Sequence, residues 1–488
     1  MVIESLKYKI LQQFGFAPTQ EQGQALDTFV SFLTDRDPQA VMILRGSAGT
    51  GKTSLSGAIV RTLLQIRQKV MLLAPTGRAA KVFSLGSGAP AYTIHRRIYR
   101  EKAFAGVDGQ FGLNDNLYTD TLFMVDEASM IANMGLGGTT FGSGCLLDDL
   151  VKFVYQGHND RLLLIGDKAQ LPPVGEEESP ALSASVMEGY GLKVYECDLN
   201  EVLRQSQSSG ILYNATLIRQ MITHDAVTGL PLIRFKGFAD IVMMPGAELV
   251  ESLGDSYHHV GMDETMVITR SNKRANIYNN GIRNMVLDRE EELSSGDMLM
   301  IVKNNYFWTE KEKKESGEGS AGAVPAFLAN GDRAKVLRVS NYIELYGFRF
   351  ATLLLQLPDY DDYEMQVTGM LDTLQSEAPA LTHEQQEELF RQVEEDYQHF
   401  VPLKADRMKS IRQDAYFNAL QIKYAYAVPC HKAQGGQWAH VYVDQGYMTD
   451  DMLTPDYIHW LYTAFTRATD KLFLVNWPKE QTCEPTDL

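Results

Sequence analysis

Short apolar runs alternate with helix-like stretches over the first 195 residues of the chain. Three of these runs are Met42–Leu44, Thr121–Val125 and Leu162–Ile165. Continuous apolar runs of this length are typical of strands that are buried on both faces of a parallel sheet. Because helical patterns separate them, we expect an α/β domain over 1–195 with a doubly wound sheet, whose carboxyl-end residues share one edge.

A second α/β pattern begins near residue 196. Thr265–Thr269 predicts a buried strand that feeds a helix, and further strands are predicted within 423–428 and 439–444. A long segment of different character interrupts this pattern. The predicted second domain therefore has two parts, 196–295 and 414–488.

The intervening segment, residues 296–413, predicts a small β insert. Strand-like stretches occupy 333–339 and 348–357, and an acidic helical stretch follows from about Thr382. The polar run from Glu310 to Ser320 predicts a mobile loop.

Residues 96–120 interrupt the first α/β pattern. The stretch 101–120 is rich in turn residues, and Val107–Gly109 separates two runs that carry Phe104 and Phe111. This pattern predicts a β-hairpin insert.

The run at 42–44 leads into Gly46-x-x-x-x-Gly51-Lys52-Thr53, which is typical of a phosphate-binding loop between a strand and a helix. The glycines let backbone N–H groups converge on phosphates, which then lie at a helix N-terminus where the dipole favours anions. Lys52 would reach the β- and γ-phosphates of ATP, and the Thr53 hydroxyl would bind Mg²⁺. Chance occurrence is the alternative, and the preceding strand pattern argues against it. The predicted nucleotide-binding loop comprises Gly46, Ser47, Ala48, Gly49, Thr50, Gly51, Lys52, Thr53 and Ser54.

Asp126 and Glu127 follow the apolar run at 121–125, at the predicted carboxyl end of a buried strand. A lone Asp-Glu pair is usually a solvated turn. Here a phosphate loop lies upstream and another apolar run, 161–166, lies downstream. We therefore expect Asp126 to hold Mg²⁺ through its water shell and Glu127 to accept the proton of the attacking water.

Further motifs follow in a fixed order between Thr19 and Lys471. They are Ala74–Ala80, Thr93–His95, Gly166–Val174, Leu199–Gln205, His431–Gly436 and Tyr462–Ala468. This ordered set resembles that of superfamily 1 helicases, and within them the 1B group, most closely its Dda and RecD-like branch and more distantly the Pif type. The resemblance implies two RecA-like parallel-sheet P-loop NTPase domains. It also implies that the hairpin insert lies in the first domain and that the β insert of the second is SH3-like.

By this resemblance, Gln22 would read the adenine edge and Gln170 would sense the γ-phosphate and its water. Arg204 and Arg467 would act as arginine fingers from the second domain. As isolated residues, Gln22 would be a polar surface side chain and either arginine a surface ion pair. The predicted catalytic set is Lys52, Glu127, Gln170, Arg204 and Arg467.

The resemblance also implies a grip on single-stranded DNA by both domains. The net charge of −17 argues at first sight against this, but twelve Asp or Glu and one Arg lie between 359 and 396. In contrast, six Lys or Arg and one acid lie between Arg78 and Lys102, although a solvated helix face is an alternative for this basic stretch. Contacts would be with phosphate, sugar and stacked bases, since a translocase must tolerate every sequence. The predicted DNA-binding residues are Pro75, Thr76, His95, Arg96, Phe104, Phe111, His431, Lys432 and Gln434.

In the resembled family, an insert at the place of 96–120 is a wedge hairpin at the DNA fork. Phe104 and Phe111 would then abut the terminal base pair. Ordinary packing phenylalanines are the alternative.

Composition fits a soluble intracellular motor. No apolar run approaches the roughly 20 residues that span a bilayer, and the N-terminus has no signal pattern. The four cysteines lack Cys-x-x-Cys spacing, which predicts a reduced compartment and no structural zinc. We expect a cytoplasmic, nucleoid-associated monomer, with single-strand-binding or replication and repair proteins as candidate partners.

The sequence therefore predicts an ATP- and Mg²⁺-dependent 5′-to-3′ helicase that acts on single-stranded DNA and 5′-tailed duplex DNA. One alternative is a nucleic-acid-stimulated translocase that remodels protein–DNA complexes or acts on RNA. The other is a protein-remodelling ATPase of the AAA+ class. The motifs at 431–436 and 462–468 argue against the latter.

Overall fold

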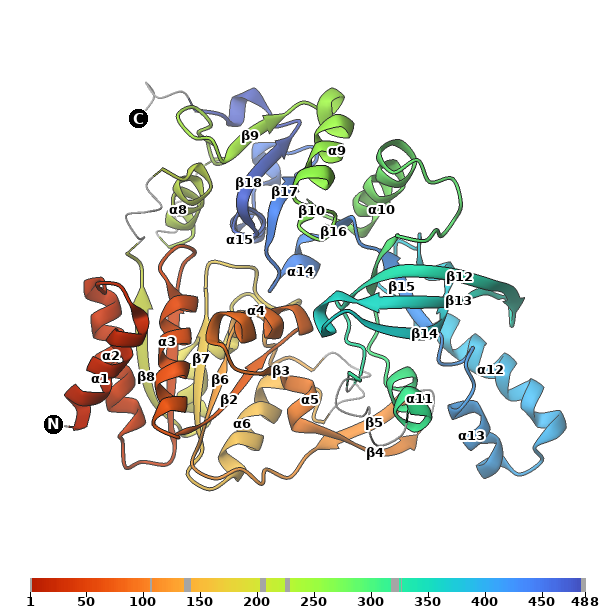
Figure 1. The fold of residues 1–488 in the computed structure, drawn as a ribbon, viewed down its shortest axis with the longest axis horizontal. Helices are drawn as coiled ribbons and strands as arrows, with labels where there is room; N and C mark the ends of the chain where they lie inside the picture. The colour runs from red at the N-terminus through yellow and green to blue at the C-terminus, as the bar shows by residue number, and fades with distance from the viewer. Residues whose placement is uncertain are drawn as a thin grey trace. The chain divides into compact units, whose positions relative to one another are not determined.

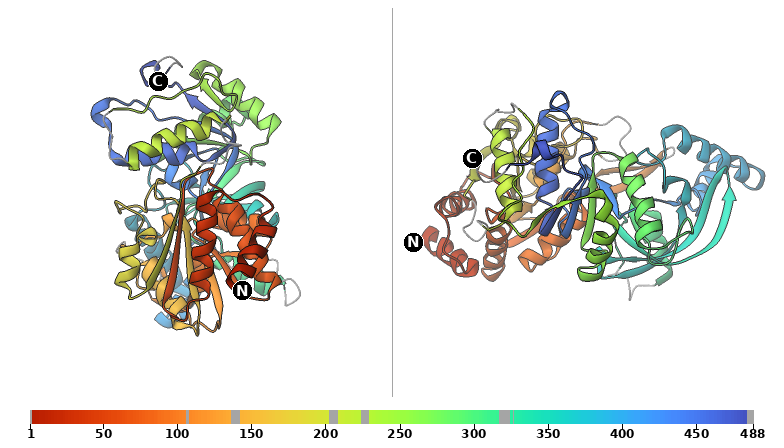
Figure 2. Two further views of the ribbon diagram at one scale, coloured as in Figure 1. Left: turned by 90° about the vertical axis from the view of Figure 1, so that its left-hand side faces the viewer. Right: turned by 90° about the horizontal axis from the view of Figure 1, so that it is seen from above.

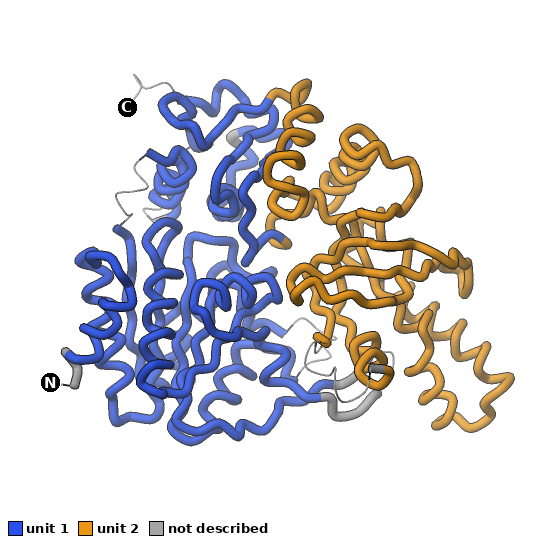
Figure 3. The backbone as a smooth tube through the Cα atoms, in the orientation of Figure 1, with its two compact units in different colours: residues 1–244, 433–488 blue, residues 245–432 orange. Residues whose placement is uncertain are grey.

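The computed structural model describes residues 2–105, 108–135, 142–201, 208–223, 229–316, 324–325 and 327–483. The chain divides into two compact units, which Figure 3 shows in different colours. Unit 1 comprises Met1–Met244 and Ala433–Leu488, and unit 2 comprises Pro245–Lys432. The chain therefore leaves unit 1 once and returns to it.

A parallel sheet of six strands forms the N-terminal part of unit 1 (Figure 1). The strand order is β3-β2-β6-β7-β1-β8, and every neighbouring pair is parallel. The strands are β1 (Ala40–Gly46), β2 (Lys69–Ala74), β3 (Ala91–Thr93), β6 (Thr121–Val125), β7 (Arg161–Gly166) and β8 (Lys193–Leu199). The predicted parallel sheet is thus confirmed. Because β8 pairs with β1 as far as Leu199, this sheet extends past the predicted boundary at residue 195.

Helices cover both faces of this sheet, as Figures 1 and 2 show. Met42 and Leu44 of β1 belong to one apolar core, and Val41 and Ile43 belong to the core on the other face. Successive residues of a strand point to opposite faces, so burial on both faces explains the unbroken apolar run. The helices of the first core are α1 (Val2–Phe14), α2 (Gln20–Leu33), α3 (Lys52–Gln65) and α4 (Gly77–Ser87). Those of the second core are α5 (Ile94–Ile98), α6 (Leu146–Gln156) and α7 (Ala184–Gly189).

A two-stranded antiparallel sheet follows α5. Its strands are β4 (Tyr99–Ala105) and β5 (Asp108–Leu113). The hairpin insert predicted for this part of the chain is therefore present.

Parallel strands also form the C-terminal part of unit 1. β18 (Ala468–Val475) pairs with β17 (Trp438–Val443) and with β9 (Ile241–Met244). The accompanying helices are α8 (Gly210–Thr223) and α15 (Pro455–Phe465). The strand predicted within 439–444 corresponds to β17.

Unit 2 contains two further parallel strands, β10 (Thr265–Thr269) and β16 (Ala427–Pro429), which pair with each other. In the chain, α9 (Leu249–His259) precedes β10 and α10 (Asn272–Gly281) follows it. The strand and helix predicted from residue 265 onward are therefore both present. The short helix α14 (Cys430–Ala433) follows β16 directly.

A closed barrel forms the rest of unit 2. Its strands are β11 (Met298–Ile301), β12 (Arg333–Leu345), β13 (Phe348–Leu357), β14 (Tyr363–Met370) and β15 (Leu420–Tyr424). The predicted β insert is thus a barrel, and its likeness to an SH3 fold stays a prediction. Between β14 and β15 the chain forms α12 (His383–Phe400) and α13 (Lys404–Arg412), where the acidic helical stretch is expected. In the described part of the chain, no helix is both long and apolar enough to cross a membrane.

Two further predictions differ from the structure. The sequence predicts a strand of the second α/β domain within 423–428, whereas the structure has two strands there: β15 (420–424) pairs with β11 and β14 in the barrel, and β16 begins only at Ala427. The predicted mobile loop from Glu310 is instead helical as far as Ser316, because α11 spans Phe307–Ser316, and its remaining residues, 317–320, lie outside the described residues. The buried Trp308 anchors this polar helix, and its indole N–H donates to the carbonyl of Asn418 (2.9 Å).

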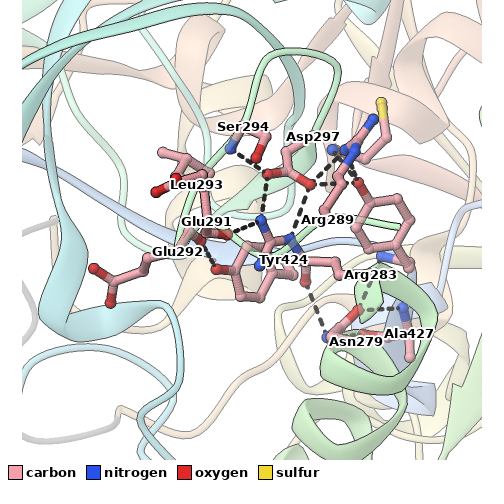
Figure 4. Close-up of polar contacts among 12 residues, drawn as sticks. Asn279, Arg283, Arg289, Glu291, Glu292, Leu293, Ser294, Asp297, Tyr424 and Ala427 are labelled. Carbon is pink, nitrogen blue, oxygen red and sulfur yellow. Dashed lines mark hydrogen bonds and ion pairs between the residues drawn. The ribbon is translucent and has the colours of Figure 1, made fainter. Parts of the chain in front are cut away.

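A buried polar cluster joins the barrel to β16 within unit 2 (Figure 4). Asp297, fully buried before β11, accepts hydrogen bonds from the guanidinium groups of Arg283 and Arg289 and from the Tyr426 hydroxyl. The Asn279 amide on α10 accepts the N–H groups of Tyr426 and Ala427. Buried charges of this kind are tolerated when they are paired and hydrogen-bonded. The cluster therefore ties α10 to the segment that leads from β15 into α14.

Candidate nucleotide and DNA sites

The phosphate loop joins β1 to α3. β1 ends at Gly46 and α3 begins at Lys52, with Gly49 and Gly51 at φ values of 77° and 82°. A Cβ at Gly46 would lie 2.9 Å from Lys52 Cγ, so this position has no room for a side chain. The Lys52 ammonium donates to the carbonyls of Gly46 (2.5 Å) and Ser47 (3.0 Å). It therefore lies over the loop, where β- and γ-phosphates bind in loops of this kind.

Gln22 supports this loop from the first turn of α2. Its Oε1 accepts the N–H of Thr19 (3.0 Å), and the Thr19 hydroxyl accepts the N–H of Gln22 (3.3 Å), which makes a capping box. The Gln22 Nε2 donates to the carbonyl of Thr50 (2.9 Å), and the residue is 1% exposed. Gln22 is thus a buried support of the loop, and its contact with adenine stays a prediction.

Asp126 and Glu127 lie at the carboxyl end of β6, next to β7 in the sheet. Burial, and then the charge of Glu127, raise the pKa of Asp126 to about 7, while Lys52 opposes this rise. Glu127 has a left-handed backbone (φ 53°), which side-chain-bearing residues seldom adopt outside turns and functional sites. Its N–H donates to the Asp126 carboxylate (2.9 Å).

The oxygens expected to hold Mg²⁺ suit that ion. Thr53 lies exposed in the first turn of α3, and Asp126 contributes a carboxylate from the strand end. Mg²⁺ prefers hard oxygen ligands and is usually held by one or two protein oxygens together with water and nucleotide phosphates. The donor set therefore fits the predicted metal.

Gln170 lies in the loop after β7, which is the neighbour of β1. It is 5% exposed, and among the described residues no group donates to its Oε1. Its N–H donates to the carbonyl of Asp167 (3.3 Å), and the Asp167 carboxylate accepts the N–H of Ala169 (3.0 Å). A buried acceptor without a donor is rare in proteins and recurs where water or a ligand binds.

Two side chains from the C-terminal part of unit 1 reach the phosphate loop. The Tyr462 hydroxyl accepts the N–H of Ala48 (2.9 Å), and Arg219 donates to the Ser47 hydroxyl (2.8 Å). Sequence reasoning did not assign either residue a role. Tyr462 lies inside a recognised motif that could have signalled it, whereas nothing in the sequence around Arg219 indicated a contact with the loop.

Arg467 follows α15 in unit 1 and is 2% exposed. Its guanidinium donates to the carbonyls of Thr463 and Gly436 and to the Thr466 hydroxyl, at 3.1 to 3.2 Å. The arginine is therefore held close to its own helix in this structure. The second predicted finger, Arg204, lies outside the described residues.

The predicted DNA contacts of unit 1 lie at the starts of short helices and beyond α14. Thr76, which follows Pro75, caps α4 by accepting the N–H of Ala79. His95 lies on α5, and burial lowers its pKa to about 4, so the ring is neutral at pH 7. The guanidinium of Arg96 lies over the Tyr92 ring at 5.1 Å, and the Gln434 amide donates to the carbonyl of Leu171 (2.7 Å).

His431 and Lys432 belong to unit 2, on α14. The Lys432 ammonium donates to Asn330 (2.7 Å) beside the barrel, and burial lowers its pKa to about 8. His431 is exposed, and desolvation by the groups around its ring, and then the charge of Lys432, lower its pKa below the usual value. A lysine beside a neutral histidine offers one cation and one hydrogen-bonding ring to a nucleic acid.

The proposed wedge residues differ in what the structure shows. Phe111 on β5 is partly buried and packs against the apolar core under α5 and α6. The side chain of Phe104 lies outside the described residues. Phe111 therefore contributes to the packing of this core, whether or not it also contacts DNA.

Two protein-family profiles match the chain. One, described as an AAA domain, matches residues 17–229, and the other, described as a UvrD-like helicase C-terminal domain, matches residues 424–475. The first covers the phosphate loop and the residues at the ends of β6 and β7. The second covers the motifs at 431–436 and 462–468.

Curated relatives include proteins of bacterial, archaeal and viral origin. An ATP-dependent RecD2 DNA helicase of Deinococcus radiodurans is 30% identical over 32% of this chain and 18% of its own length. An uncharacterized protein of Methanocaldococcus jannaschii is 33% identical over 32% of this chain and 13% of its own. The chain thus spans less than a fifth of the length of each of these two relatives. An uncharacterized protein of Acanthamoeba polyphaga mimivirus is 21% identical over 90% of this chain and 96% of its own length.

Solved structures that resemble the chain include Pif1 helicases. One, from Bacteroides in complex with ADP-AlF3 and ssDNA, has 14% identity and a TM-score of 0.45 and covers 96% of this chain and 95% of that one. Another, from Candida albicans, has 16% identity and a TM-score of 0.41 and covers 96% and 97%.

Proposed function

We propose that the chain is a superfamily 1B helicase, an ATP-dependent DNA helicase that moves 5′ to 3′ on single-stranded DNA. One observation supports this most. The phosphate loop, the Asp126–Glu127 pair and Gln170 follow strands β1, β6 and β7, which are consecutive in one parallel sheet. Ligands bind at this edge of parallel sheets, so all three groups face one nucleotide.

In this proposal the groups divide the chemistry of hydrolysis. Lys52 and the loop N–H groups hold the phosphates, and the proposed ligands of Mg²⁺ are Thr53 and Asp126. The ion would neutralise charge on the β- and γ-phosphate oxygens. Glu127 orients the attacking water and takes its proton, and the unpaired Oε1 of Gln170 accepts a hydrogen bond from the same water.

Transition-state charge is the proposed target of the arginines. Phosphoryl transfer spreads negative charge over the γ-phosphate oxygens, and a guanidinium stabilises it. We propose Arg467 and Arg204 for this role. Arg467 would have to exchange its hydrogen bonds near α15 for phosphate oxygens, so its movement would couple hydrolysis to a change of conformation.

We propose that single-stranded DNA contacts Pro75, Thr76, His95, Arg96 and Gln434 in unit 1 and His431 and Lys432 in unit 2. Monomeric action, association with the nucleoid and contacts with replication or repair proteins are further proposals. The match to a UvrD-like C-terminal domain supports a helicase over a protein-remodelling AAA+ enzyme.

An unwinding assay on duplexes with a 5′ or a 3′ single-stranded tail tests this function. We expect ATP-dependent strand separation of the 5′-tailed DNA, and none for the Lys52→Ala variant or the 3′-tailed DNA. A 5′-tailed RNA duplex serves as the substrate control. ATPase activity with DNA but no strand separation would favour the translocase alternative, and unwinding from the 3′ tail would refute the polarity.

The wedge hairpin gives a separate prediction. Phe104→Ala and Phe111→Ala should slow unwinding of 5′-tailed duplexes while DNA-stimulated ATPase activity and movement on single strands persist. Stacking on an aromatic ring contributes roughly 1–3 kcal/mol per base, comparable with about 1.4 kcal/mol for opening one base-pair step. Unwinding and translocation should be measured on the same variants.

Because Phe111 also packs on the core, its variants need a control. Phe111→Leu keeps apolar packing and removes the aromatic face, so it should retain the unfolding temperature and still unwind slowly. Equal loss of translocation and unwinding would indicate a folding or grip defect. Normal unwinding in all three variants would place the wedge elsewhere.

A pH dependence follows from Lys432. Since its pKa lies at about 8, its ammonium is charged below that pH and loses its proton above it. Phosphate binding requires the charged form, so affinity for single-stranded DNA should fall on the order of tenfold from pH 7 to pH 9. Fluorescence anisotropy across this range measures the effect. The Lys432→Arg variant stays charged and should flatten the profile; identical profiles for the two proteins would exclude Lys432 as a phosphate contact.

A further inference from the structure

The Tyr462 hydroxyl links two parts of the nucleotide site. It donates to the Asp167 carboxylate (2.6 Å) and accepts the N–H of Ala48 in the phosphate loop (2.9 Å). Tyr462 lies on α15 and is 1% exposed, and Asp167 is 3% exposed. One buried hydroxyl therefore connects α15 to the loop after β7 and to the loop after β1.

Other contacts hold the loop after β7 against the same part of unit 1. The N–H of Leu171 donates to the Thr463 hydroxyl (2.8 Å), and the Leu171 carbonyl accepts from the Gln434 amide (2.7 Å). The Nδ1 of His459 lies 2.9 Å from the carbonyl oxygen of Ala169. These contacts fix the backbone on both sides of Gln170.

The protonation state of Tyr462 suits this arrangement. Burial, and then the charge of Asp167 that accepts its proton, hold the pKa of the hydroxyl well above its usual value. It therefore stays a donor to Asp167 throughout the neutral range. A lone pair of the same oxygen accepts the Ala48 N–H.

We propose that Tyr462 is a positioning residue for ATP hydrolysis, which holds Asp167 so that Gln170 and the phosphate loop keep the spacing that the transition state requires. Asp167 sets the loop conformation, because its carboxylate caps the N–H of Ala169 and its carbonyl accepts the N–H of Gln170. Small displacements of groups that orient water cost far more in turnover than in substrate binding. Phosphate binding itself would depend on Lys52 and the loop N–H groups.

Tyr462→Phe tests this inference, with Tyr457→Phe as the matched control. Tyr457 lies on the same helix, is 2% exposed, and donates its hydroxyl to Gln445 (2.5 Å), away from the phosphate loop. Tyr462→Phe should lower the DNA-stimulated kcat about tenfold, the size expected for loss of a hydrogen bond to a charged group. The KM for ATP should change by at most about twofold, because the freed Ala48 N–H can still bind phosphate. Tyr457→Phe should leave kcat unchanged at a similar unfolding temperature.

A double-mutant cycle with Asp167→Ala identifies the route of the effect. If Tyr462 acts through Asp167, the double variant should be no slower than Asp167→Ala alone, whereas additive losses of kcat would overturn the inference. An unchanged kcat in Tyr462→Phe, or an equal loss in Tyr457→Phe, would also overturn it. The inference rests on the proposed ATPase function, so the unsubstituted protein is assayed alongside. Absence of DNA-stimulated hydrolysis there would refute the function itself, while normal activity with an unaffected variant refutes only the role of Tyr462.

Discussion

Replacing Glu127 by glutamine should lower DNA-stimulated ATP turnover by about 10²–10⁴-fold and leave ATP binding nearly unchanged. The amide keeps the size of the carboxylate but accepts no proton from the attacking water. The Glu127 N–H would still donate to Asp126, so the backbone of the strand end should persist. Steady-state turnover and stopped-flow binding of a fluorescent nucleotide measure the two effects separately.

Lys52→Ala provides the contrast for this variant. It removes the positive charge over the phosphate loop, so both nucleotide affinity and turnover should fall. Near-normal turnover in Glu127→Gln would show that another group acts as the base. Loss of binding in both variants to the same extent would indicate that Glu127 shapes the loop and has no part in proton transfer.

The sequence predicts those parts of the site that depend on local pattern. The phosphate loop and the Asp126–Glu127 pair each follow an apolar strand, and burial on both faces makes such strands recognisable. The sheet then places them together, because parallel strands present their carboxyl ends at one edge. The negative net charge does not argue against a nucleotide site on this sheet, because most of the excess acidic residues lie in the region of β14 and α12.

Contacts between distant residues could not be predicted in the same way. Tyr462 and Asp167 are 295 positions apart, and Arg219 and Ser47 are 172 apart. Their pairing depends on how the C-terminal part of unit 1 packs on the first sheet, which no local pattern records. The assignment of 420–424 was wrong for a related reason. A short strand has a similar sequence pattern in a barrel and in a parallel sheet, and only its pairing partners show to which of the two it belongs.

The polar segment after Glu310 shows how tertiary contacts override composition. Its charged residues predict a mobile loop, yet α11 forms because the buried Trp308 fixes its first turn to Asn418. The helix propensity of a segment predicts its structure poorly when a single large buried side chain anchors the helix. Phe111 also packs on the core, as the alternative of an ordinary packing phenylalanine expects, and its contact with the DNA fork stays a prediction.

Arg467→Ala should lower kcat by about 10³-fold or more, with a much smaller loss of nucleotide affinity. The charge that a guanidinium stabilises grows in the transition state, so the ground-state complex should lose little. Arg467→Lys should restore little of the activity, because the planar guanidinium of arginine matches two phosphate oxygens at once and the compact ammonium of lysine does not. Nucleotide binding and steady-state turnover with single-stranded DNA would be measured on both variants.

The contacts of Arg467 in this structure require a control for its structural contribution. Its buried guanidinium also donates to Thr463, Gly436 and Thr466, so its removal leaves buried acceptors without donors and should lower the unfolding temperature. Thr466→Ala removes one of these partners and keeps the guanidinium, so it should turn over ATP at nearly the normal rate. If Thr466→Ala were as slow as Arg467→Ala, the arginine would act by holding its helix. If Arg467→Ala lost affinity and kept kcat, the arginine would be a clamp on the bound nucleotide, and the finger role would pass to Arg204 alone.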